Sequence, residues 1–217
     1  MTQKKIHIDE RKLQHQYGYR FIKRLFDVVA SSVAVVILSP VFLIIAIAIK
    51  INDPAGPVFY TQTRVGKDGK PFKMFKFRSM VTNADELLEK LRDQNEVEGA
   101  MFKMKDDPRI TKVGKFIRKY SLDELPQLLN VVGGSMSIVG PRPPLPYEVK
   151  EYTDYDRQRL MVKPGATGMW QVGGRNALSF DQMVELDLTY VNERSIWLDL
   201  KIMFKTVKVM IKPNAAY

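Results

Sequence analysis

Two adjacent acidic residues, Asp123 and Glu124, are the side chains in this sequence whose types and spacing best suit chemistry. They follow Ser121 in the segment SLDELPQLLN, which reads as the start of a helix. Neighbouring residues of a helix point about 100° apart, so the two carboxylates cannot share one proton as a symmetrical pair. We therefore expect them to play different parts, such as nucleophile and metal ligand.

The same stretch has a purely structural interpretation. Ser121 followed three residues later by Glu124 matches the capping box, in which each side chain accepts a hydrogen bond from an otherwise unpaired backbone N–H. The helix would then turn four leucines toward a core: Leu122, Leu125, Leu128 and Leu129. Capping boxes are far commoner than active sites, so the stretch by itself favours a cap.

A segment rich in cationic residues directly precedes the carboxylate pair in the sequence. The net charge of the chain is +10 and its pI is about 9.6, which implies an anionic partner: nucleic acid, an acidic membrane surface or a phosphorylated substrate. The segment before the pair supplies Arg109, Lys112, Lys115, Arg118 and Lys119. Such a density of cations beside two acids suits a diphosphate, although charge alone does not choose among these partners.

The composition narrows the chemistry that is available. Cysteine is absent, which excludes disulfides, thiolate nucleophiles and the usual structural zinc sites. The two histidines, His7 and His15, lie in a polar arm at residues 1–20, ahead of any segment that reads as packed. Carboxylates, lysines and arginines must therefore do any chemistry.

Two loops could present arginines to phosphates. The segment GGSMSIVGPRPPLP at residues 133–146 holds Arg142 between two prolines, whose fixed φ leaves the guanidinium little entropy to lose. A second loop, KPGATGMWQVGGRN at residues 163–176, surrounds Arg175 with glycines, which let backbone N–H groups approach phosphate oxygens. Neither loop contains a known nucleotide-binding fingerprint.

The strongest physical signal is an uncharged run from Val28 to Ile49. As a helix, its roughly 22 residues would span about 33 Å, enough to cross a bilayer. Ser39-Pro40 interrupts the run, because proline removes a backbone hydrogen bond, and the basic residues at both ends belong in the cytoplasm by the positive-inside rule. We favour a re-entrant helix over residues 21–51 that breaks at Ser39-Pro40. A spanning helix is the alternative, and a cleaved signal peptide is disfavoured because the run is long and begins late.

Residues 52–217 read as a compact cytosolic catalytic domain, and the chain as a whole as α+β and predominantly helical. The sequence VFYTQTRVGKDGKPFKMFKFRSM predicts a small β element, two segments around a turn at Gly66 to Gly69. Its alternating phenylalanines and basic residues suit a half-buried strand better than a nucleic-acid surface. Helical periodicity marks residues 83–95 and 180–211, and the second helix carries an apolar stripe suited to a core or a membrane interface, formed by Trp197, Leu200, Met203, Phe204 and Val207.

Several of these motifs occur in an order that resembles one family. They are KRLFD at residues 23–27, the apolar run broken at Ser39-Pro40, KFRSM at residues 76–80, SLDELPQLLNV, VGPRP and KPGATGMWQVGGRN. From about residue 20 onward, the chain is similar to bacterial sugar transferases of the monotopic phosphoglycosyl transferase family. Each motif is weak alone, whereas several in a fixed order are specific.

The resemblance implies an enzyme on the cytosolic face of the bacterial cytoplasmic membrane. Such enzymes transfer a sugar 1-phosphate from a UDP-sugar to polyprenyl phosphate with Mg²⁺, which starts the assembly of surface glycans. The implied partners are the UDP-sugar, polyprenyl phosphate and membrane lipid, with no nucleic acid and with a homodimer left open. The loop GMWQVGGR differs from that of smaller members, and the ending VKVMIKPNAAY resembles that of larger members, which hints at a hexose 1-phosphate donor such as glucose or galactose.

The resemblance also assigns roles to individual residues. Asp123 would be the nucleophile that attacks the β-phosphate of the donor and releases UMP, and Glu124, beside Asp123, would bind Mg²⁺. Phosphate contacts would come from Lys76, Arg118 and Arg175, and Arg142 would help to hold the nucleotide. Metal and guanidinium charges offset the repulsion between two anions in phosphoryl transfer. In this context catalysis becomes the favoured role of the carboxylate pair.

A rival hypothesis comes from another functional class. A membrane-anchored basic module could bind anionic lipid or nucleic acid without catalysis. This hypothesis explains the charge and the apolar run, but it does not explain why Asp123 and Glu124 follow a cationic segment. Replacing Asp123 with Asn separates the two classes, because only an enzyme would lose turnover.

Overall fold

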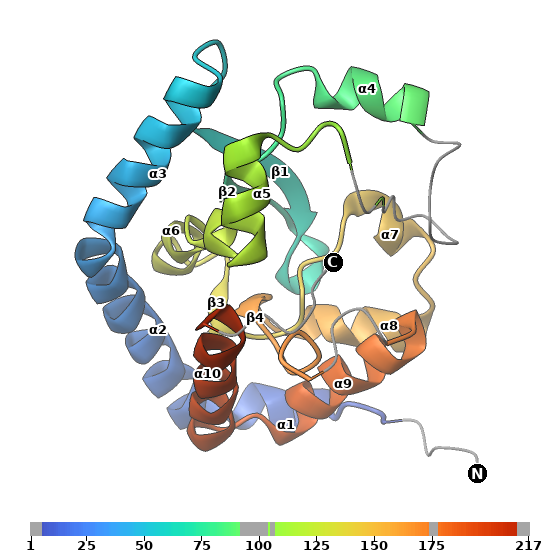
Figure 1. Cartoon of the computed structure of the whole chain (residues 1–217). Helices are drawn as coiled ribbons and strands as arrows, with labels where there is room; N and C mark the ends of the chain where they lie inside the picture. The colour runs from blue at the N-terminus through green and yellow to red at the C-terminus, as the bar shows by residue number, and fades with distance from the viewer. Residues whose placement is uncertain (1–5, 92–103, 105–106, 174–177, 212–217) are drawn as a thin grey trace.

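The computed structural model describes residues 6–91, 104, 107–173 and 178–211. Within these residues the chain is predominantly helical, with two small two-stranded sheets, as the sequence predicts (Figure 1). The helices are α1 Glu10–His15, α2 Tyr17–Ile37, α3 Ser39–Asn52, α4 Ala84–Leu91, α5 Lys112–Lys119, α6 Gln127–Val132, α7 Pro146–Lys150, α8 Asp154–Arg157, α9 Phe180–Glu193 and α10 Ile196–Ile211. The strands are β1 Phe59–Val65, β2 Pro71–Phe77, β3 Ser137–Val139 and β4 Gly165–Thr167, and the 3₁₀ turns are η1 Lys67–Gly69, η3 Leu122–Glu124 and η4 Gln158–Met161.

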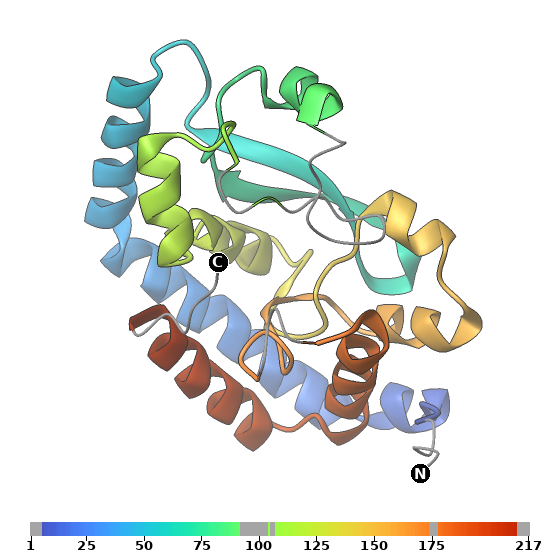
Figure 2. The same cartoon turned by 45° about the vertical axis from the view of Figure 1, so that its right-hand side comes forward.

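Helices α2 and α3 form a bent apolar pair along one edge of the molecule (Figure 2). The two axes meet at 59°, and the break falls at Leu38, directly before Ser39 and Pro40. The proline sits in the first turn of α3, where its missing N–H removes no helical hydrogen bond. Among the described residues no one helix has the length and apolarity to cross a bilayer, whereas this bent pair meets that test by length and composition.

Buried polar contacts tie the first half of α2 to the rest of the fold. The buried Asp27 carboxylate accepts hydrogen bonds from Ser137 Oγ at 2.7 Å and from the backbone N–H of Ile138 at 3.2 Å, which joins α2 to β3. The Arg24 guanidinium donates to the carbonyls of Val131 and Val132, at 2.6 and 2.9 Å. These are terminal carbonyls of α6, which lack partners within their own helix.

The predicted β element is an antiparallel hairpin. Strands β1 and β2 pair from Phe59 opposite Phe77 to Val65 opposite Pro71. The turn between them includes Asp68 and Gly69 in the left-handed region, with φ of 57° and 75°. The second sheet is parallel and shorter, with β3 beside β4. The hairpin therefore forms a long stiff element that connects two ends of the molecule.

Apolar side chains pack into clusters on either side of the hairpin. One cluster joins α3 to β2 and α5 through Ile45, Ile49, Phe77 and Ile117. Another, formed by Val139, Val162, Tyr190, Val191 and Ile202, joins β3 to α9 and α10. The apolar pair α2–α3 is thus packed against the domain on one side and exposes large apolar residues on the other, including Phe21, Val36, Leu43 and Ile51.

Two predicted segments look different in the structure. The described part of the N-terminal arm is helical, because the Asp9 carboxylate caps α1 by accepting the backbone N–H groups of Arg11 and Lys12. In α10 the predicted apolar stripe is divided: Met203 packs against the core cluster, whereas Trp197 and Phe204 are 78% and 79% exposed, as an interface face would be. The face of α10 that is buried instead carries Asp199 and Ile202.

Candidate active site

The turn that carries the two carboxylates follows directly from the end of α5. Ser121 has φ of 54°, and its backbone N–H bonds to the Arg118 carbonyl at 3.0 Å. This left-handed residue after a helix is a C-terminal cap. Ser121 makes no side-chain cap for the 3₁₀ turn that follows, so the predicted capping box is wrong. The chain reverses at Ser121 and leads into η3 rather than into a long helix.

The carboxylates of Asp123 and Glu124 face different surroundings. Successive residues of a 3₁₀ turn project about 120° apart. Asp123 is 8% exposed, whereas the Glu124 side chain is 38% exposed. The prediction that the two acids cannot form a symmetrical pair agrees with this geometry. The leucines of the same segment are divided: Leu122 and Leu125 pack against the α3 cluster, whereas Leu129 is exposed.

Strand β2 brings Lys76 to the carboxylates. The Lys76 ammonium donates to Glu124 Oε1 at 2.8 Å. Lys76 lies near the end of the hairpin, opposite Tyr60, and its neighbour Phe77 is buried in the core. Because side chains alternate along a strand, Lys76 leaves the strand on the face opposite Phe77 and is free to reach Glu124. The structure therefore places one of the predicted phosphate ligands beside the pair.

Burial and charge together set the ionisation of Asp123. The pKa of Asp123 is raised to about 6, chiefly by burial and also by the adjacent Glu124 charge, while the cations of Lys76 and Arg118 oppose the rise. These opposing effects also show that Arg118, on α5, lies close enough to act on Asp123. Among the described residues no side chain donates a hydrogen bond to the Asp123 carboxylate, so the carboxylate remains available to a substrate.

The loop with Arg142 reaches the site through Arg64, a residue that sequence reasoning did not assign to it. Buried Arg64 donates to the carbonyl of Pro143 at 3.1 Å and to Gln62 Oε1 at 2.6 Å. Its pKa is lowered to about 10 by burial and by the Arg142 cation, with the carboxylates of Glu148 and Glu124 opposing. Arg64 therefore lies close enough to both Glu124 and Arg142 for their charges to act on it. Its local sequence carries no signal for this role, because the Pro143 carbonyl that it contacts is 79 residues away.

A second buried arginine forms an ion pair whose charge acts on Arg142 of the same loop. Arg159 pairs with fully buried Asp187 of α9. Burial raises the pKa of Asp187 to about 6, against the opposing charges of Arg159 and Arg142. Arg142 itself turns its guanidinium toward Glu148, with 3.9 Å between Nη1 and Oε1. Neither Arg159 nor Asp187 carries a sequence signal, because their pairing joins distant segments.

Two further residues that the sequence singled out are Arg109 and Arg175. Arg109, from the cationic segment, is buried and binds its neighbour Asp107 at 2.6 Å. Arg175 was predicted to contact phosphates, and it lies outside the described residues. The structure therefore brings together Asp123, Glu124, Lys76 and Arg118, with Arg64 linking them to the Arg142 loop.

The donor set fits a hard divalent cation. Within the described residues no three acidic or histidine side chains converge. Mg²⁺, however, is usually held by one or two carboxylates together with waters and substrate phosphates. Asp123 and Glu124 supply two carboxylates on adjacent residues, and the first lacks a side-chain donor. The site thus has the chemistry for Mg²⁺ only when a phosphate ligand completes it.

Comparison with known proteins reveals clear relatives. The chain is 44% identical over 203 residues to a galactosyl transferase, CpsE, of Streptococcus agalactiae, which covers 93% of this chain and 45% of the relative. It is 48% identical over 202 residues to the undecaprenyl-phosphate galactose phosphotransferase of Salmonella typhimurium, covering 91% and 42%. The exopolysaccharide production protein ExoY of Rhizobium meliloti is 44% identical over 199 residues, covering 90% and 88%.

This chain spans less than half the length of the first two relatives and most of the length of the third. The shared part includes the apolar helix pair, the hairpin and the carboxylate turn. The model of the bacterial sugar transferase family matches residues 18–213, nearly the whole chain. The chain therefore belongs to the bacterial sugar transferase family.

Proposed function

We propose that this chain transfers a sugar 1-phosphate from a UDP-sugar to polyprenyl phosphate. The observation that carries the proposal is buried Asp123, whose carboxylate has no side-chain donor and lies next to the Lys76–Glu124 ion pair. Relatives named as undecaprenyl-phosphate galactose phosphotransferase and as UDP-glucose:undecaprenyl-phosphate glucose-1-phosphate transferase support a hexose 1-phosphate and undecaprenyl phosphate. The product would feed exopolysaccharide or capsule assembly.

The first step is an attack by Asp123. A carboxylate oxygen of Asp123 forms a bond to the β-phosphorus of the UDP-sugar, and the bond from that phosphorus to the bridging oxygen breaks. UMP leaves with the electron pair, and the sugar phosphate remains on the enzyme as an acyl phosphate. Because the pKa of Asp123 is about 6, the attacking carboxylate is ionised at neutral pH without a separate base.

The second step returns the enzyme to its starting state. A phosphate oxygen of polyprenyl phosphate attacks the same phosphorus, and the bond between phosphorus and the Asp123 oxygen breaks. The products are the polyprenyl diphosphate sugar and the free carboxylate. Both attacking groups are anions, so each step needs cations that offset repulsion from the phosphates.

The chain supplies these cations from three elements. Lys76 of β2 and Arg118 of α5 act on the carboxylate pair, and Arg64 of β1 holds the Arg142 loop, which would contact the nucleotide. Arg175 would add a further phosphate contact. Mg²⁺, held by Glu124 with Asp123 and the substrate phosphates, would neutralise charge on the diphosphate. Lys76 holds one oxygen of the Glu124 carboxylate at 2.8 Å.

The bent pair α2–α3 supports a reaction at a membrane. Its outer face carries exposed apolar side chains from Phe21 to Ile51, and its 59° bend suits a helix that enters the lipid and returns. The proposal puts both ends of this pair, and the carboxylate pair with them, on the cytosolic face of the bacterial cytoplasmic membrane. There the lipid-bound acceptor phosphate and the soluble donor meet.

The test is UMP release by the protein held in nanodiscs. A panel of UDP-sugars is offered with and without polyprenyl phosphate and Mg²⁺, and Asp123→Asn is assayed beside the wild type. We expect release that depends on one sugar, on the metal and on Asp123, with the variant slower by roughly a thousandfold or more, the scale for loss of a nucleophile. Trapping the radiolabelled sugar phosphate on wild-type protein tests the covalent step.

Two outcomes would overturn the proposal. UMP release that persists in Asp123→Asn would remove the nucleophile from its role. Absence of release with every donor, from protein shown to be folded by circular dichroism, would favour the binding module instead. In that case, if the wild type and Asp123→Asn both remained bound to the membrane, the chain would act as a membrane-anchored binding module.

A further inference from the structure

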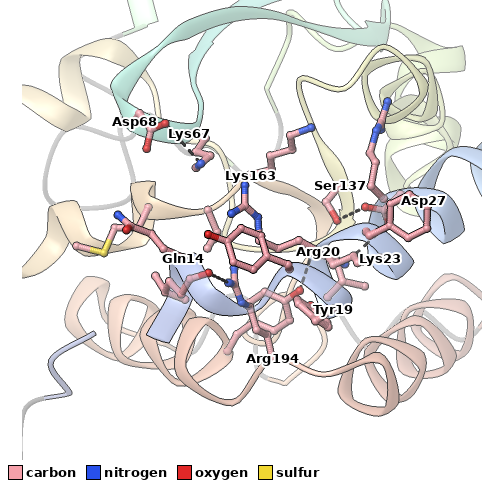
Figure 3. A pocket seen from close by; sticks show the side chains of 18 of the residues that line it. Gln14, Tyr19, Arg20, Lys23, Asp27, Lys67, Asp68, Ser137, Lys163 and Arg194 are labelled. Atoms are coloured by element: carbon pink, nitrogen blue, oxygen red, sulfur yellow. Dashed lines mark hydrogen bonds and ion pairs between the residues drawn. The ribbon is translucent and has the colours of Figure 1, made fainter. Parts of the chain in front are cut away.

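A large cavity lies away from the carboxylate pair. It has a volume of about 590 Å³ and is lined by α1, α2, η1, β3, α9 and the segment before β4. Figure 3 shows its side chains reaching inward from these elements. The hairpin separates the cavity from Asp123, because Lys67 lies at its turn and Lys76 at its other end. At about 3.3 Å per residue, β2 alone spans roughly 20 Å.

Cationic side chains outnumber acidic ones in the lining. Six are present: Arg20, Lys23, Arg24, Lys67, Lys163 and Arg194. The lining also contains three acids, Glu10, Asp27 and Asp68. Two of the cations are neutralised locally, since Lys23 lies 3.0 Å from Asp199 and Lys67 lies 3.6 Å from Asp68. Asp27 is engaged by Ser137, by the backbone of Ile138 and by Lys23 at 3.8 Å.

The other four cations lack an acidic partner. Within the described part of the chain, no carboxylate lies within ion-pair distance of Arg20, Arg24, Lys163 or Arg194. Arg24 and Arg194 donate only to neutral oxygens, namely the α6 carbonyls and the oxygens of Gln16 and Leu13. Their charge therefore remains uncompensated within the cavity wall.

The side chains of Lys163 and Arg24 approach the same point, beside Gly134. A Cβ atom on Gly134, which has φ of 85°, would lie 3.3 Å from Nη2 of Arg24 and 3.7 Å from Nζ of Lys163. Burial lowers the pKa of Lys163, and the charges of Arg24, Lys67 and Arg20 lower it further, against the opposing Asp27. Like charges held this close repel one another, and a bound anion would relieve that repulsion.

The cavity meets the exposed apolar face of α2. Arg20 and Arg24 lie on the same helix as Tyr17 and Phe21, which also line the cavity and are 67% and 71% exposed. Phe21 belongs to the surface that the proposed function places at the membrane. A ligand that joins a phosphate group to an apolar chain would satisfy both features, the cations inside and the aromatic side chains at the edge.

We propose that this cavity binds the phosphate group of an anionic lipid, with Arg20, Arg24 and Lys163 as its ligands, at a site separate from Asp123. The membrane part of this inference rests on the proposed function, whereas phosphate binding by the cavity does not. Bound there, the lipid would hold the beginning of α2 at the headgroup level.

The test measures binding to detergent-solubilised protein by the shift of its thermal unfolding. The probes are dihexanoyl phosphatidic acid, neutral dihexanoyl phosphatidylcholine and inorganic phosphate at matched concentrations. We expect saturable stabilisation by phosphatidic acid that exceeds stabilisation by the other two. Lys163→Gln and exposed Arg20→Gln should each weaken binding by about tenfold, the scale for a lost charge-assisted contact. Lys150→Gln removes an equal charge from an exposed position on α7, outside the cavity lining, and should bind like the wild type.

Three results would overturn the inference. Equal weakening by Lys150→Gln would reduce the effect to net charge, and unchanged binding in both cavity variants would exclude the cavity. Inorganic phosphate that binds as tightly as phosphatidic acid would exclude the lipid as its ligand. Asp123→Asn separates this inference from the proposed function, since it should abolish UMP release and leave phosphatidic acid binding intact.

Discussion

Lys76 lies 2.8 Å from Glu124, whereas no cationic group in the described residues lies within 4.0 Å of the Asp123 carboxylate. Two adjacent carboxylates therefore differ sharply in environment. The exposed one is neutralised by a direct partner, and the buried one feels Lys76 and Arg118 only from a distance. This division leaves one acid to be held in place and the other to react.

The pH dependence of turnover follows from the ionisation of Asp123. Its pKa is raised to about 6, and only the carboxylate form can attack phosphorus. We expect kcat/KM for UMP release to rise with pH up to about 6 and then to level off. Glu124→Gln should move this acid limb to lower pH in the residual activity, since it removes a like charge. Lys76→Met should move it to higher pH. Movement in the opposite directions would contradict the electrostatic account.

Asp123 should also destabilise the folded protein. Its pKa is about 6 in the fold and 3.8 ordinarily, so between these values the folded state binds more protons and stability falls as pH rises. The difference corresponds to at most about 3 kcal/mol. We expect Asp123→Asn to unfold at higher denaturant concentration than the wild type at neutral pH. This difference in stability between Asp123→Asn and the wild type should disappear below pH 3.8, because Asp123 is then protonated in both the folded and the unfolded wild type.

The buried pair under the Arg142 loop should be costly to break. Asp187→Leu leaves Arg159 charged and unpaired, and we expect a loss of about 3–5 kcal/mol in unfolding free energy. The double variant Asp187→Leu/Arg159→Met should recover most of that loss. It should still show low kcat/KM, because Arg142 has lost the nearby Asp187 charge. Full recovery of activity would mean that Asp187 does not position the loop.

A close approach of backbone to backbone positions Arg118. A methyl group on Gly114 of α5 would overlap the carbonyl oxygen of Ser79. We expect Gly114→Ala to cost more than about 2 kcal/mol, as overpacking does, and to lower turnover through displaced Arg118. Gly18→Ala is the matched control, because nothing lies within 4 Å of its added carbon. Gly114→Ala should therefore unfold at a lower temperature than Gly18→Ala.

The course of the bent pair through the membrane can be tested with single cysteines, since the chain has none of its own. Lys12→Cys and Ala55→Cys place thiols before α2 and after α3, both at exposed positions. If the pair is re-entrant, an impermeant maleimide should label both only after the cells are made permeable. Labelling of one of the two in intact cells would indicate a spanning helix.

Local features were predictable from the sequence because neighbouring residues determine them. The hairpin follows from alternation around a turn, and the break in the apolar run from Pro40. Ser121 misled the prediction because the capping-box spacing does not reveal a positive φ, which arises from the reversal after α5.

The missed residues depend on contacts between distant segments. Arg64 reaches the Pro143 carbonyl 79 residues away, and Arg159 reaches Asp187 28 residues away. Nothing in the local sequence of either arginine reports its partner. The exposed stripe of α10 has the periodicity of a core face as well as that of an interface, and periodicity alone does not distinguish them.

The joint at Asp27 has a mechanical consequence. Asp27 is buried and fixes α2 to β3 through Ser137 and Ile138, while Ile45 and Ile49 fix α3 to Phe77 and Ile117. Under the proposed arrangement, the height of Asp123 above the lipid is therefore a built-in dimension of the protein. A thinner or thicker bilayer would have to adapt to the helix pair, and the reacting carboxylate would keep its level.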